Sequence, residues 1–174
     1  MSTLSTLKLT PETPADRSLV ATLIARTYLA VGAEMIEMTG RLRSLPQHRD
    51  ELGVLAADAQ NQALGYALFT PVTVGTTKDA ALLLAPLAYD TLHDGIDPNA
   101  LLAAMLNYAK DKGYRYVLMH GDLEACRELG LQDAEEIGVT SAVHYPNTIL
   151  LVKDFEPGTP ATLSGAVQYP PFIK

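Results

Sequence analysis

Residues 83–122, "LLAPLAYDTLHDGIDPNALLAAMLNYAKDKGYRYVLMHGD", change from strand-like to helix-like composition and back. The opening run is short and almost wholly apolar, as in strands that are covered on both faces. Residues 99–112 place apolar side chains on one helical stripe, and Gly113 follows at the position where helices commonly end. Tyrosine and valine then mark residues 114–121 as another strand. The stretch therefore predicts strand, helix and strand, with a strand-to-helix junction near residue 95.

The flanking sequence adds helices before this stretch and strands on both sides of it. Further helices are expected at residues 13–32, where Thr13 caps and Pro14 begins the first turn, at 33–46 and at 122–130. Further strands are expected on either side of the polar tip 58–62, at two places within 135–155, and as an edge strand at 165–169. This order predicts an α+β fold with a mixed sheet.

Composition limits the classes of function. The chain has 174 residues, of which 48% are apolar, so we expect one globular domain. Its net charge of −7 argues against a nucleic-acid partner, and its longest apolar run contains a proline and is too short to span a membrane. The first residues lack the features of a secretory signal, and Cys126 has no second cysteine to pair with. We therefore expect a cytoplasmic protein.

Four local strings carry a resemblance to a known family. They are "LLAPLAY" at 83–89, "GYRYVLMHGD" at 113–122, "CRELGL" at 126–131 and "GAVQYPPF" at 165–172. Together they resemble a bacterial branch of the GNAT superfamily of acyl-CoA-dependent N-acyltransferases, from about residue 41 onward. The resemblance implies one GNAT-like N-acetyltransferase domain over residues 1–174. Its expected fold is a central mixed, mostly antiparallel sheet flanked by helices.

The resemblance also implies acetyl-CoA as the cofactor and indicates where it would bind. Backbone groups of the strand end would contact the pantetheine arm, and the loop with the helix start would hold the pyrophosphate. The strand residues are Leu87, Ala88 and Tyr89, and the loop and helix residues are Gly95, Ile96, Asp97, Asn99 and Ala100.

The expected phosphate loop departs from the family pattern. Asp94 replaces the usual glutamine or arginine, and Asp97 and Asn99 replace two glycines. A carboxylate about 5 Å from a phosphate charge would cost roughly 3 kcal/mol at an effective dielectric of about 20. The alternative is structural: Asp97 followed by Pro98 is a favourable N-cap and first-turn pair. In that case, the aspartate would bind the N–H groups that phosphate would otherwise use.

Two residues are candidates for catalysis. Cys126 occupies the position where the family has a tyrosine that protonates the departing thiolate, and His120 lies near the expected place of a general base. Each has a structural alternative, as a packed helix residue and as a hydrogen-bonded residue at a strand end. Glu34 and Glu37 are candidates for an amine pocket, or else solvated helix charges. The four histidines show no paired metal-ligand spacing, so no metal site is expected.

Two functions remain open from the sequence. One is transfer of an acetyl group from acetyl-CoA to an unidentified small-molecule or peptide amine. The other is a degenerate, non-catalytic GNAT-like module that binds a small ligand or a protein, since both the loop glycines and the helix tyrosine are replaced. The tail "GAVQYPPFIK" can pair within the chain or across a homodimer.

Overall fold

The computed structural model describes residues 7–93 and 96–174, which fold as two compact units. The first unit comprises the chain up to Thr70 together with Ala85–Tyr108, and the second comprises Pro71–Leu84 together with Ala109–Lys174. Three elements run through both units: strands β3 (Ala63–Val74) and β4 (Thr77–Tyr89), and helix α3 (Pro98–Asp111). The expectation of one domain over residues 1–174 stays a prediction.

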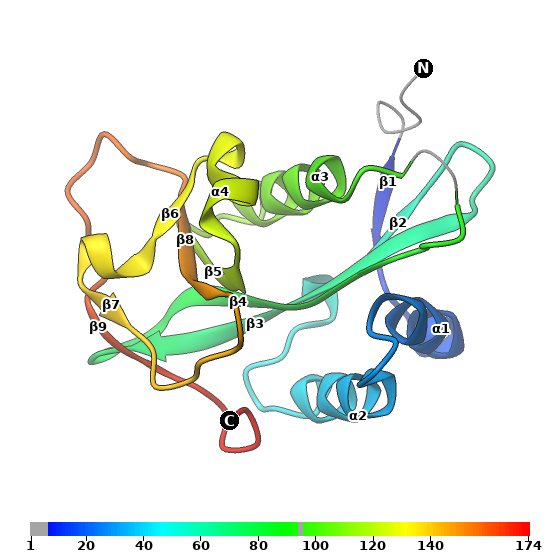
Figure 1. Ribbon diagram of the computed structural model, residues 1–174, viewed down its shortest axis with the longest axis horizontal. Coiled ribbons are helices and arrows are strands. Elements are labelled where there is room, and N and C mark those ends of the chain that lie inside the picture. Colours follow the sequence, from blue (N-terminus) through cyan, green and yellow to red (C-terminus); the bar gives the residue numbers. More distant parts are fainter. Residues whose placement is uncertain (1–6, 94–95) are drawn as a thin grey trace. The chain divides into compact units, whose positions relative to one another are not determined.

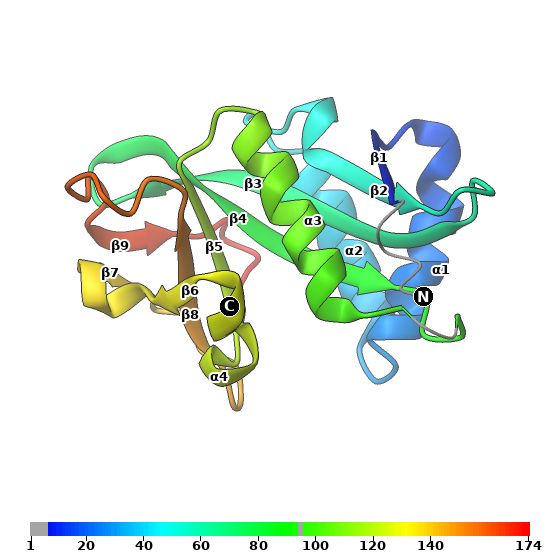
Figure 2. The same cartoon turned by 90° about the horizontal axis from the view of Figure 1, so that it is seen from above.

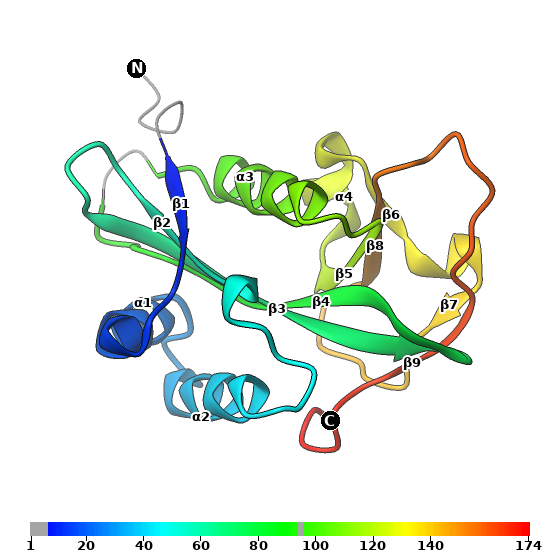
Figure 3. The same cartoon turned by 180° about the vertical axis from the view of Figure 1, so that it is seen from behind.

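The first unit is a set of strands with helices on both faces. It adds β1 (Lys8–Pro11), α1 (Arg17–Thr27), α2 (Gly32–Arg43) and β2 (Gly53–Ala57), and its strand order is β1-β2-β3-β4. Helices α1 and α2 cover one face and α3 the other (Figure 1, Figure 3). Helix α3 packs very closely against β3. A Cβ added at Gly65 would stand 2.7 Å from the Leu101 side chain, so a larger residue at this position would displace that side chain. The first unit thus holds both parts of the expected cofactor site.

A buried polar cluster connects three segments of the first unit. Arg43, at the end of α2, donates to both carboxylate oxygens of Glu12 over 2.7 and 3.0 Å. The buried Tyr66 on β3 donates its hydroxyl to the same carboxylate over 2.7 Å. A buried charge needs such partners, so this cluster holds the segment after β1 against α2 and β3.

The second unit is built mainly of short strands. These are β5 (Tyr116–Gly121), β6 (Leu131–Asp133), β7 (Val139–Thr140), β8 (Ile149–Asp154) and β9 (Gly165–Gln168), with the short helix α4 (Leu123–Cys126). Strand β5 pairs parallel with β4 at Leu82 and Leu83 and antiparallel with β8, which also pairs with β6 (Figure 2). Strand β9 pairs antiparallel with β3 and parallel with β7. The expected mixed, mostly antiparallel sheet is confirmed.

The predicted elements of the central stretch are confirmed with small shifts of their ends. Gly113 adopts a left-handed φ of 91° just beyond α3, and Gly130 one of 77° beyond the turn that follows α4. Single 3-10 turns occur at Pro14–Asp16, Asp50–Leu52, Arg127–Leu129 and Ala134–Ile137. The prediction missed β1 and β6, which have only four and three residues. Within the described ranges, no helix combines the length and apolar character needed to cross a bilayer.

Candidate active site

The end of β4 presents backbone groups at an edge that β3 does not occupy. The Asp90 N–H donates to the Leu64 carbonyl over 2.8 Å, so the backbone groups of Asp90 point toward β3. Because backbone groups alternate between the two edges of a strand, Leu87 and Tyr89 direct theirs to the opposite edge. These are the strand residues for which the resemblance implies contacts with the pantetheine arm.

Side-chain hydroxyls at the end of α1 occupy this edge of β4. Tyr28 donates to the Leu87 carbonyl over 3.0 Å. Thr27 Oγ1 accepts the Tyr89 N–H over 2.9 Å and also lies 3.1 Å from the Tyr89 carbonyl. Burial raises the pKa of Tyr28, so its phenol remains a protonated donor. The edge is therefore satisfied by two hydroxyls from the α1 end.

An ion pair balances one of the aspartates beside this edge. Arg26 Nη1 lies 3.1 Å from Oδ1 of the buried Asp90. The same oxygen accepts the Leu92 N–H over 3.0 Å, which shapes the turn after β4. The sequence has no lysine or arginine between Lys78 and Lys110, but Arg26 of α1 supplies a positive charge beside Asp90.

The start of α3 confirms the structural interpretation of Asp97. Its carboxylate accepts the Asn99 N–H over 3.0 Å, and its carbonyl accepts the Leu101 N–H over 3.0 Å. Pro98, the first residue of α3, has no N–H to offer. Three of the first four helical positions are thus closed to an anion, which leaves Ala100 as the remaining one. Ile96 precedes this cap, whereas Asp94 and Gly95 lie outside the described residues.

His120, near the end of β5, belongs to a hydrogen-bonded chain in the second unit. Its Nε2 lies 2.9 Å from the Tyr169 hydroxyl, and that hydroxyl lies 2.6 Å from Ser141 Oγ. Ser141 in turn donates to the Val143 carbonyl over 2.8 Å and accepts the Val143 N–H over 3.1 Å. The chain thus joins a strand end to two segments that follow it in sequence.

The surroundings of His120 keep its imidazole neutral. Burial lowers the pKa of His120 from its ordinary value, and the nearby His144 lowers it further. The ring of Tyr145 stands edge-on to the imidazole, with ring centres 4.9 Å apart. A neutral imidazole at pH 7 has one nitrogen able to accept a proton, as a general base requires.

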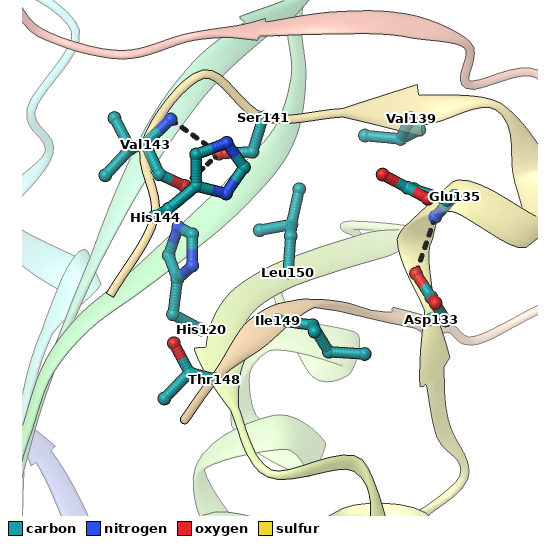
Figure 4. Close-up of a pocket in the computed structure, with 10 residues that line it drawn as sticks. All are labelled: His120, Asp133, Glu135, Val139, Ser141, Val143, His144, Thr148, Ile149 and Leu150. Carbon is teal, nitrogen blue, oxygen red and sulfur yellow. Dashed lines mark hydrogen bonds between the residues drawn. The ribbon is translucent and has the colours of Figure 1, made fainter. Parts of the chain in front are cut away.

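A cavity of about 120 Å³ lies beside this histidine. It is lined by His120, Asp133, Glu135, Val139, Ser141, Val143, His144, Thr148, Ile149 and Leu150. Figure 4 shows carboxylates on one side of it and the two imidazoles on the other, with apolar side chains between them. The described residues that line it include no lysine or arginine, so the cavity suits a ligand that donates hydrogen bonds.

Cys126, the other catalytic candidate, lies buried at the end of α4. Burial raises the pKa of its thiol, and Asp122 raises it further. A Cβ added at Gly121 would stand 3.8 Å from its sulfur. The thiol is therefore a protonated, closely packed group.

The candidates for an amine pocket lie on the exposed surface of α2. Glu37 forms an ion pair of 2.7 Å with Arg41, one helical turn away, and Glu34 is exposed. These positions fit the alternative that both are solvated helix charges.

The structure gathers the predicted residues into two groups. The described cofactor candidates belong to the first unit: Leu87, Ala88, Tyr89, Ile96, Asp97, Asn99 and Ala100. His120 and Cys126 belong to the second unit. Sequence reasoning missed Thr27, Tyr28, Ser141 and Tyr169. For Tyr169 a signal was present, since it lies in the "GAVQYPPF" string.

Comparison with known proteins gives structural relatives only. No protein-family model and no curated protein matches the sequence. A GNAT family N-acetyltransferase (YhbS) from Escherichia coli, solved with CoA, is 24% identical with a TM-score of 0.76, over 95% of this chain and 90% of that one. A GNAT family acetyltransferase from Brucella melitensis, solved with acetyl-CoA, is 19% identical with a TM-score of 0.71, over 95% of this chain and 96% of that one.

The chain has the GNAT fold. A third similar structure, spermidine N-acetyltransferase from Vibrio cholerae with CoA and spermine, is 14% identical with a TM-score of 0.58, over 86% of this chain and 96% of that one. The resemblance seen in the four sequence strings is thus confirmed for the fold. A shared fold does not determine function, which depends on the residues of the site.

Proposed function

We propose that this GNAT-fold protein is an N-acetyltransferase that binds acetyl-CoA and acetylates an unidentified amine. The observation that supports the proposal most is the end of β4. There, the backbone groups of Leu87 and Tyr89 are bonded to side-chain hydroxyls of Tyr28 and Thr27. Such hydroxyls can exchange for the amide groups of an extended ligand, as when a peptide adds to a sheet edge. Three of the solved neighbours were crystallised with CoA or acetyl-CoA.

The described residues fit the two ends of the cofactor unequally. The β4 edge has the alternating donors and acceptors that suit the amides of a pantetheine arm. The α3 start suits a pyrophosphate poorly, because Asp97 already caps the helix and carries a negative charge. The cofactor is therefore expected to be held mainly by β4, with weaker binding than a glycine loop would give.

The residues of the second unit supply the proposed acid–base chemistry. Acetyl-CoA would provide an acetyl thioester, so that a C–N bond to the amine forms as the C–S bond breaks. We assign His120 the role of the base that removes the amine proton, since its neutral imidazole lines the cavity. Cys126 stays the candidate donor to the thiolate. The carboxylates of Asp133 and Glu135 favour a cationic or amine ligand.

The Tyr28→Phe variant tests whether the hydroxyl and the cofactor share one site. If both bind the Leu87 carbonyl, the loss of the phenol hydroxyl removes the competitor. One hydrogen bond contributes about 0.5–1.5 kcal/mol, so we expect the Kd of coenzyme A to fall by roughly 2- to 10-fold in calorimetric titration.

Tyr108→Phe is the matched control for this titration. Tyr108 also donates to a backbone carbonyl, that of Glu51, over 2.6 Å within the first unit. Its replacement removes a comparable hydrogen bond away from β4, so the Kd should equal that of the wild type. An unchanged or weaker affinity of Tyr28→Phe for coenzyme A would show that the Tyr28 hydroxyl does not compete with the cofactor.

The alternative function is a non-catalytic GNAT-like module that binds a different small ligand or a protein. The observation that favours it is the start of α3, where the negatively charged Asp97 carboxylate caps the helix at the place where a pyrophosphate would bind. The same titration separates the two functions. A protein that binds no coenzyme A, even as Tyr28→Phe, belongs to the non-catalytic class.

A further inference from the structure

The hydrogen bonds from His120 to Val143 have a defined direction. Ser141 has one hydroxyl proton, and it donates that proton to the Val143 carbonyl over 2.8 Å. Ser141 Oγ must therefore accept from Tyr169, whose oxygen lies 2.6 Å away. The phenol proton is thus used, and the Tyr169 oxygen can only accept from His120. The contact of 2.9 Å accordingly requires a proton on His120 Nε2.

We propose that Tyr169, held by Ser141, is a positioning residue that fixes His120 as the Nε2–H tautomer and leaves Nδ1 as its proton acceptor. The assignment of Nδ1 as the base rests on the proposed function. The tautomer itself rests only on the hydrogen-bond chain. A hydrogen-bond partner that sets a tautomer in this way also determines which ring nitrogen is available for chemistry.

The surroundings of Tyr169 suit this role. It follows β9, and its ring lies against the imidazole with centres 5.9 Å apart and planes inclined by 31°. Burial raises the pKa of its phenol, so the hydroxyl keeps its proton and can serve as acceptor and donor together. The hydrogen bond and the ring contact both restrain the His120 side chain near the cavity.

Nitrogen-15 NMR of the imidazole at neutral pH tests the proposal directly, since protonated and unprotonated ring nitrogens have distinct shifts. The wild type should show His120 with a proton on Nε2. In Tyr169→Phe the acceptor is lost, and the ratio of the Nε2–H to the Nδ1–H form should fall by roughly 2- to 10-fold.

Ser141→Ala gives a second, directional test. Without Ser141 Oγ, the Tyr169 hydroxyl loses the acceptor of its proton and can rotate to donate to Nε2 of His120. This variant should therefore enrich the Nδ1–H form, although Tyr169 is still present. A purely structural role for Ser141 would leave the tautomer ratio unchanged.

Tyr145→Phe is the matched control. It removes a phenol hydroxyl from the other ring that contacts His120 and leaves the Tyr169 chain intact, so the Nε2–H form should persist. A wild-type Nδ1–H form, or an unchanged ratio in Tyr169→Phe, would overturn the inference whatever the activity. The expected NMR pattern in a protein without transferase activity would support the tautomer and contradict only the proposed function.

Discussion

Replacement of His120 by glutamine should lower kcat for acetyl transfer by about 10²- to 10⁴-fold, the usual contribution of a general base. Glutamine retains an N–H that can donate to Tyr169, but it has no basic nitrogen to take the amine proton. The fold of the second unit should be preserved, because the side chain is partly exposed and its polar contact can be replaced. The measurement is a single-turnover assay with acetyl-CoA and primary amines, with spermine as the first probe.

Two further measurements show whether the loss of activity in His120→Gln is catalytic or structural. The Kd of acetyl-CoA should be unchanged in His120→Gln, since the substitution leaves the backbone groups of Leu87 and Tyr89 that would hold the cofactor as they are. The pKa of His120 lies below its ordinary value, so the wild-type rate should be intact at pH 7 and decline only below about pH 6.5. A variant that keeps kcat within threefold of the wild type would remove His120 from the mechanism.

The double variant Asp97→Gly, Asn99→Gly should bind coenzyme A roughly 100-fold more tightly than the wild type. Removal of a carboxylate about 5 Å from a phosphate charge relieves roughly 3 kcal/mol at an effective dielectric of about 20. It also releases the Asn99-position N–H that Asp97 now binds. The loss of the cap should cost about 1 kcal/mol in the free energy of unfolding, with a further cost from the new glycines.

Pantetheine, which has the same arm without the pyrophosphate, is the matched ligand for this experiment. Calorimetric titration of the wild type and the double variant should show tighter binding of coenzyme A by the variant and equal binding of pantetheine by both proteins. An equal gain for both ligands would mean that the substitutions act on β4 or on the general stability of the first unit. No gain for coenzyme A would show that the Asp97 carboxylate does not limit pyrophosphate binding.

The parts of the structure that the sequence predicts depend on local patterns. The apolar run of β4, the helical stripe of α3 and the Asp97–Pro98 cap can each be recognised within a few residues. Strand β1 escaped prediction because four residues are too few to display alternation, and its place depends on pairing with β2.

The contacts that shape the site connect distant parts of the sequence, which explains why they could not be predicted. Arg26 pairs with Asp90, Tyr28 bonds to the Leu87 carbonyl, and Tyr169 meets His120 only through folding. The sequence has no lysine or arginine between Lys78 and Lys110, and only the fold brings Arg26 to one of the aspartates in that interval. Conversely, no feature of the sequence indicated that the β4 edge is closed by the hydroxyls of Thr27 and Tyr28 at the end of α1.

We expect the end of β4 to bind the acyl-CoA arm in exchange for the hydroxyls of Tyr28 and Thr27. Isothermal titration of the wild-type protein with acetyl-CoA, and separately with coenzyme A, at physiological salt tests it most directly. We expect saturable binding of both ligands with a Kd in the micromolar range, where 1 μM corresponds to about −8 kcal/mol. Absence of binding at millimolar cofactor would show that β4 does not bind the acyl-CoA arm and would assign the protein to the non-catalytic class.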